Sequence, residues 1–148
     1  MPFNPRSLKN LRKIIDKTSK KEDTQIILTS SWRISHDCMI VLKARLIEYG
    51  IKINAVTEKL DNRGEEIKEW LQERRLLPNI YGVPDIIFII IDDENDHFNE
   101  YFSNEHIVLT NPNRGLNYFK TKEAIHKLKG MKNKSYVKRN RLLWFKRK

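Results

Sequence analysis

The feature that most constrains the fold is a run of six apolar residues, Ile86 to Ile91, which ends in the acids Asp92 and Asp93. Six residues are far fewer than the ~20 that a membrane-spanning helix needs. An apolar run without polar alternation instead predicts a strand that is buried on both faces, at the centre of a parallel sheet. Parallel strands need long crossover connections, which are usually helices. The rest of the chain should therefore supply helices for both faces of the sheet.

The segments around this strand alternate between helical and strand patterns. The spacing of apolar residues and the capping residues predict helices over 5–20 and 35–50, from about Gly64 within 61–77, and over 121–130. Further strands are predicted at 24–31, at 51–53 and at the start of 106–115. This order predicts an α/β fold with a Rossmann-like, three-layer α/β/α architecture and a mostly parallel sheet with right-handed connections.

Length and charge predict one domain with a basic tail. The chain has 148 residues and a formal charge of +10, and nine Lys or Arg but no acid lie in its last twenty residues. We therefore expect an α/β domain over 1–129 and a basic C-terminal tail over 130–148. Cys38 is the single cysteine, and the N-terminus has no apolar signal-peptide core, so we expect a cytoplasmic protein that does not bind membranes.

Polar side chains follow three of the predicted strands. Thr29, Ser30 and Ser31 end the first strand, Asp92 and Asp93 end the central one, and "IVLTN" ends the last. Ligands bind at the carboxyl ends of the strands in such sheets, so the three segments predict one site. The hydroxyls can donate hydrogen bonds to a phosphoryl oxygen, and the adjacent carboxylates fit Mg²⁺. The alternatives are that the hydroxyls cap the next segment and that the acids are solvated at a strand end or cap a helix.

Arg63 stands just before a predicted helix, with Gly64 behind it. A guanidinium at that place can pair with a phosphate near the positive end of the helix. The alternative is a surface Arg that pairs with a nearby Glu, which contributes little. The four histidines show no ligand spacing, and Cys38 lies within a helical apolar pattern, so we assign them no catalytic role.

Five segments taken in order resemble the haloacid dehalogenase-like (HAD) hydrolase superfamily, and more narrowly the small HAD domains associated with RNA-repair proteins. They are "FNPRSLKNLRKIIDKT", "IILTSSWR", "RGEEIKEWL", "FIIIDDEND" and "IVLTNPNRGL", and they span roughly Phe3 to Leu128. The resemblance implies that Thr29, with Ser30 as second choice, holds a transferring phosphoryl group. It implies that Arg63, rather than Lys68, neutralises phosphate charge, and that Asp92 and Asp93 hold Mg²⁺. The implied chemistry is phosphoryl transfer through an aspartyl-phosphate.

The sequence departs from that family at the nucleophile. The family carries a D-x-D motif on its first, central strand, whereas this chain has no D-x-D and begins at the helix that should follow that strand. Three explanations stay open. The two flanking strands pair directly in a form that has lost catalysis; the strand comes from another chain or from the tail segment "RLLWF"; or the true start lies upstream of Met1. Open strand edges also favour a homo-oligomer.

The tail mixes cations with Tyr136, Trp144 and Phe145. Cations neutralise backbone phosphates and aromatic faces stack on bases, so the tail is a candidate nucleic-acid-binding segment. The residues predicted to carry this contact are Lys138, Arg139, Arg141, Lys146 and Arg147. The alternatives are a solubilising tail, an apolar piece that docks on the body, and a membrane-surface segment.

Two functions therefore compete. One is a Mg²⁺-dependent phosphohydrolase that acts on nucleic-acid or nucleotide phosphates. The other is a catalytically inactive module that binds nucleic acid or a protein partner through its basic tail.

Overall fold

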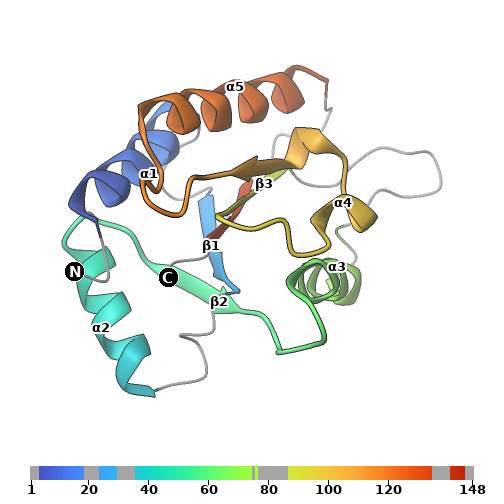
Figure 1. The fold of residues 1–148 in the computed structure, drawn as a ribbon, viewed down its shortest axis with the longest axis horizontal. Coiled ribbons are helices and arrows are strands. Elements are labelled where there is room, and N and C mark those ends of the chain that lie inside the picture. The colour runs from blue at the N-terminus through green and yellow to red at the C-terminus, as the bar shows by residue number, and fades with distance from the viewer. Residues whose placement is uncertain are drawn as a thin grey trace.

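A computed structural model describes residues 4–18, 24–29, 36–74, 76, 87–134 and 141–145, with the backbone alone at 132–134 and 141–145. The fold is α/β, as predicted (Figure 1). The strands are β1 (Thr24–Leu28), β2 (Ile53–Val56), β3 (Ile87–Asp92), β4 (Ile107–Leu109) and β5 (Arg141–Phe145). They form one five-stranded sheet in the order β2-β1-β5-β3-β4, and all four neighbouring pairs are parallel.

The tail segment "RLLWF" forms β5 and fills the centre of the sheet. Leu143 pairs with Ile26 of β1 on one side and with Ile89 of β3 on the other. Of the three explanations for the missing strand, the structure shows the one in which the tail supplies it. Each of β1 and β3 therefore has a partner on both sides, although the prediction of a homo-oligomer stays a prediction.

Helices cover both faces of the sheet (Figure 1). The helices are α1 (Pro5–Thr18), α2 (His36–Ile47), α3 (Arg63–Glu73), α4 (Phe98–Tyr101) and α5 (Tyr118–Lys134), and η3 (Asn104–His106) is a short 3₁₀ helix. One apolar cluster joins α1, α2 and α5 to one face, around Leu11, Leu42 and Leu128. A second joins α3 and α4 to the other face, around Ile67 and Phe98. Side chains of β3 alternate between the two clusters, and all of its residues are buried, as predicted for a central strand.

Helix ends account for the two largest boundary differences. Gly50, with φ of 70°, ends α2 as predicted, and the Ile51 N–H donates to the Leu46 carbonyl, which draws Ile51 into the cap. As a result β2 begins at Ile53, rather than spanning 51–53. The Asn117 side chain accepts the Lys120 N–H, so α5 begins at Tyr118 instead of Thr121.

The tail boundary predicted at residue 130 falls inside α5, which runs to Lys134. The division of the chain into two functional units stays a prediction. None of the helices in the described ranges is long and apolar enough to cross a lipid bilayer.

Candidate functional site

The predicted site lies at the carboxyl edge of the sheet. In register, Phe145 of β5 is level with Leu28 of β1 and with Ile91 of β3. Thr29 and Asp92 come one residue later, so they flank the end of β5 from its two sides. Two strand spacings separate them, which is about 10 Å. Both are buried, with 2% and 1% of their surface exposed. The structure therefore brings them to one edge, but with a strand between them.

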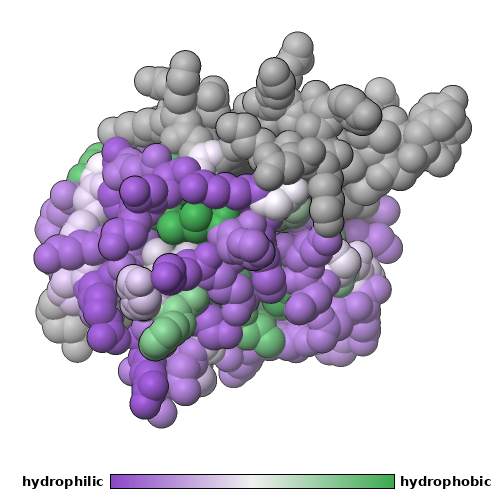
Figure 2. Space-filling view, turned by 90° about the horizontal axis from the view of Figure 1, so that it is seen from above, coloured by the Kyte–Doolittle hydropathy of each residue, from purple (hydrophilic) through white to green (hydrophobic). Residues whose placement is uncertain are grey.

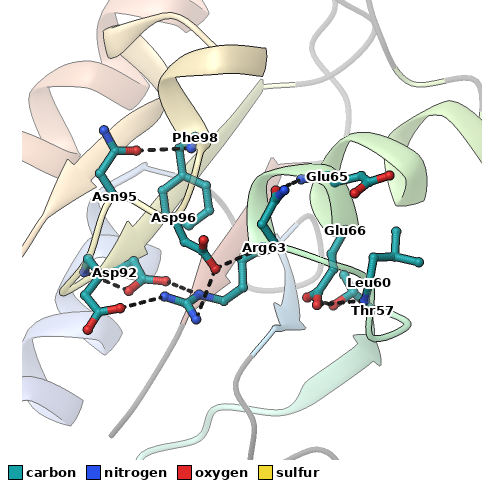
Figure 3. A network of polar contacts seen from close by, with 11 residues as sticks. Thr57, Leu60, Arg63, Glu65, Glu66, Asp92, Asn95, Asp96 and Phe98 are labelled. Atoms are coloured by element: carbon teal, nitrogen blue, oxygen red, sulfur yellow. Dashed lines mark hydrogen bonds and ion pairs between the residues drawn. The ribbon is translucent and has the colours of Figure 1, made fainter.

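Arg63 contacts Asp92 directly (Figure 3). Its Nε donates to Asp92 Oδ2 at 3.0 Å, and its two terminal nitrogens lie 3.4 Å from Asp96 and 3.5 Å from Glu94. Burial alone would lower the pKa of Arg63, but the three carboxylates outweigh it and the pKa is raised above its ordinary value. Arg63 is thus a permanently charged link between the start of α3 and the end of β3.

The first turn of α3 has its backbone donors satisfied by the protein. The Arg63 N–H donates to the Asp96 side chain and the Gly64 N–H to the Asp96 carbonyl, each at 3.0 Å. The Glu65 N–H donates to the Asn62 side chain at 2.8 Å, and the Glu66 N–H to the Asn62 carbonyl. Free N–H groups are what make a helix N-terminus an anion site. This N-terminus instead serves to fasten α3 to the loop after β3.

Gly64 allows that close approach. A Cβ at this position would lie 2.7 Å from the carbonyl oxygen of His97, closer than real Cβ atoms come to backbone. The loop and the helix therefore pack backbone against backbone, and this contact sets the position of Arg63 over Asp92.

Glu66 is a buried acid, 4% exposed, that the sequence analysis did not single out. Its carboxylate accepts the Leu60 N–H at 3.0 Å and the Thr57 hydroxyl at 3.3 Å (Figure 3). These bonds hold the loop after β2 against α3. The sequence analysis also missed Asp96, although its spacing of four residues from Asp92 after a buried strand was a usable signal.

The described acids do not fit a Mg²⁺ site. Asp92 Oδ2 accepts from Arg63 and Asp92 Oδ1 accepts the Glu94 N–H at 3.0 Å, so both oxygens are already engaged. Among the described residues no group of three His, Cys, Asp or Glu is arranged to hold a metal ion. The cation at the end of β3 is the guanidinium of Arg63, and we route no chemistry through a metal here.

The remaining predicted residues are divided by the structure. Lys68 lies over the Tyr101 ring, 5.0 Å from its centroid. Ser30, Ser31, Lys138, Arg139, Lys146 and Arg147 lie outside the described residues. Arg141 begins β5 at the amino edge of the sheet. The predicted basic residues therefore do not form one continuous arm, because β5 separates Lys138 and Arg139 from Lys146 and Arg147 along the chain.

A comparison with protein-family models matches residues 1–120 to the HAD domain in Swiss Army Knife RNA repair proteins. This match confirms the resemblance drawn from the five sequence segments. No curated protein and no solved structure matches the chain.

Proposed function

Because this chain belongs to the family of HAD domains in Swiss Army Knife RNA repair proteins, we propose that it is a HAD-like module that binds nucleic acid without hydrolysing its phosphates. The observation that carries this proposal is the identity of the central strand. β5 has the sequence Arg-Leu-Leu-Trp-Phe, and Lys146, Arg147 and Lys148 follow it in the chain. The segment at the centre of the sheet thus leads into cations, whereas phosphoryl transfer through an aspartyl-phosphate needs a carboxylate there.

The charges beside this strand support the same conclusion. Arg63 is matched by Asp92, Glu94 and Asp96, so this group carries a net negative charge. A phosphate would be repelled by the group unless other cations were added. The basic residues on either side of β5 are the cations the sequence offers, and we assign the affinity for nucleic acid to Lys138, Arg139, Arg141, Lys146 and Arg147.

Turnover and binding measurements on the full chain test this function. With Mg²⁺ and either p-nitrophenyl phosphate or a 5′-phosphorylated RNA, we expect no release of phosphate above the buffer rate. We expect salt-sensitive binding of an RNA oligonucleotide, weakened in a Lys146→Ala/Arg147→Ala variant. Substitutions are preferable to deletion of residues 130–148, because that deletion would also remove β5.

The second candidate is a Mg²⁺-dependent phosphatase acting on nucleic-acid or nucleotide phosphates. It is favoured by the contact of Arg63 with Asp92 at the edge that also holds Thr29. Phosphate release that Asp92→Asn abolishes would establish this activity and refute the non-hydrolytic module. We expect either form to work in the cytoplasm, in keeping with the single cysteine.

A further inference from the structure

A hollow of about 440 Å³ lies between the first turns of α1 and α5, away from the acids around Arg63. It is lined by Arg6, Asn10, Arg114, Asn117, Tyr118 and Phe119. Its place in the fold follows from β4, which ends at the carboxyl edge of the sheet and leads through a turn at 111–115 into α5. The volume is within the range of ligand-binding clefts, about 300–1,000 Å³.

Hydrogen bonds fix the walls of this hollow. Arg6 donates to the Arg114 carbonyl at 3.2 Å, and the Asn10 amide donates to the Leu116 carbonyl at 2.8 Å. The Leu116 N–H donates in turn to the Ser7 hydroxyl, and the Leu116 side chain is buried in the core. The turn before α5 is therefore fastened to α1 at three points. A surface held in this way binds a ligand with little further loss of conformational entropy.

The hollow combines cations with exposed aromatic rings. Its lining has two guanidinium groups and no carboxylate. Tyr118 is 57% exposed and Phe119 is 75% exposed, and the two rings meet edge to face at 5.6 Å. Lys122 lies over the Tyr118 ring at 4.9 Å from its centroid. Seen from the side of α1 and α5, most of the surface that is not grey is hydrophilic (Figure 2), so large exposed aromatic side chains are unusual for this part of the molecule.

We propose that this hollow binds single-stranded nucleic acid, with one base stacked on Phe119 and the neighbouring phosphates on Arg6 and Arg114. Flat aromatic faces beside cations are the combination that single strands need, since every base has a face and every linkage a phosphate. A duplex keeps its base faces stacked inside, and so offers the ring nothing to stack on. The inference rests on the proposed function in naming nucleic acid as the partner, but it assigns binding to residues outside the basic tail.

Fluorescence anisotropy of a labelled single-stranded RNA with the full-length protein tests this assignment. Phe119→Ala should weaken binding by about 5- to 150-fold, which is the affinity that one stacked base contributes. Arg114→Gln should lower the slope of log affinity against log salt by about 0.7, the value for one lost phosphate contact on a single strand. The matched control is Ile47→Ala, which removes a side chain that is 68% exposed on α2, and it should bind like the parent.

The outcomes separate this inference from the function on which it rests. Unchanged binding in Phe119→Ala, with weakened binding in Lys146→Ala/Arg147→Ala, would overturn the hollow and leave the basic tail as the site. The reverse pattern would support the hollow and refute the tail. Equal loss of duplex and single-stranded RNA in Phe119→Ala would overturn stacking. A poly-glutamate peptide that competes as well as RNA would overturn nucleic acid as the partner. A DNA strand of the same sequence shows whether the 2′-hydroxyl contributes.

Discussion

The contact between Arg63 and Asp92 leads to a quantitative prediction about stability. Arg63→Met removes the cation from a carboxylate that is 1% exposed, while the apolar stem of the side chain is kept. Breaking a buried ion pair from one side costs about 3–5 kcal/mol, because the remaining charge is left without compensation. Arg63 retains 17% exposure, so we expect the low end of this range, about 3 kcal/mol. Folded domains have about 5–15 kcal/mol in total, so the loss should be easily measured.

A double-mutant cycle isolates the part of this loss that belongs to the pair. Asp92→Asn is the second change, since the amide keeps an oxygen for the Glu94 N–H. In the double variant no charge is buried, and we expect a coupling energy of about 2 kcal/mol. The matched control is the surface pair Arg45–Glu48, with 3.2 Å between its charged atoms and side chains that are 28% and 56% exposed. Its coupling energy should be about 0.5 kcal/mol or less.

Urea unfolding followed by tryptophan fluorescence supplies the free energies, because Trp70 is buried between α3 and the sheet. The slope of free energy against urea should be equal in all variants, so that changes in midpoint report stability alone. If the Arg63–Asp92 coupling is no larger than that of the control pair, the two groups do not act as a buried pair, and our account of the rim is wrong.

Three further predictions concern packing, pH and the central strand. Gly64→Ala should destabilise the fold by more than about 1 kcal/mol through its contact with His97, whereas Gly130→Ala in α5, with nothing within 4 Å, should gain up to about 1 kcal/mol in urea unfolding. Burial lowers the pKa of His106, so it is neutral when folded and takes up a proton on unfolding. Stability should therefore fall as the pH drops below about 6.5, with a shallower fall in His106→Asn, as thermal melts at several pH values would show. Leu143→Pro removes an N–H from the middle of β5, and circular dichroism should then show no cooperative transition.

Sequence patterns predicted the elements whose stability is local. The apolar spacing in α1 and the uninterrupted run in β3 each state how much of the segment is buried. The strand-end rule likewise brought Thr29 and Asp92 to one edge. Such patterns do not report which side chains will contact one another, and so the direct pairing of Arg63 with Asp92 was not predicted.

Elements that depend on distant partners could not be assigned. β5 has five residues among cations, and nothing local marks it as a central strand; its pairing with β1 and β3 is entirely long-range. The short helix α4 has no periodicity to detect. The Asn95 side chain accepts the Phe98 N–H, and the buried Phe98 ring joins the second apolar cluster.

The position of β5 has a consequence for how the chain acquires its structure during synthesis. β1 and β3 leave the ribosome before the strand that joins them, so each waits with an unsatisfied edge. Proteins dominated by such distant pairings fold slowly. Between the emergence of β3 and that of β5, the nascent chain is two half-sheets, and this interval is when a chaperone or a second chain would find it most open to misassembly.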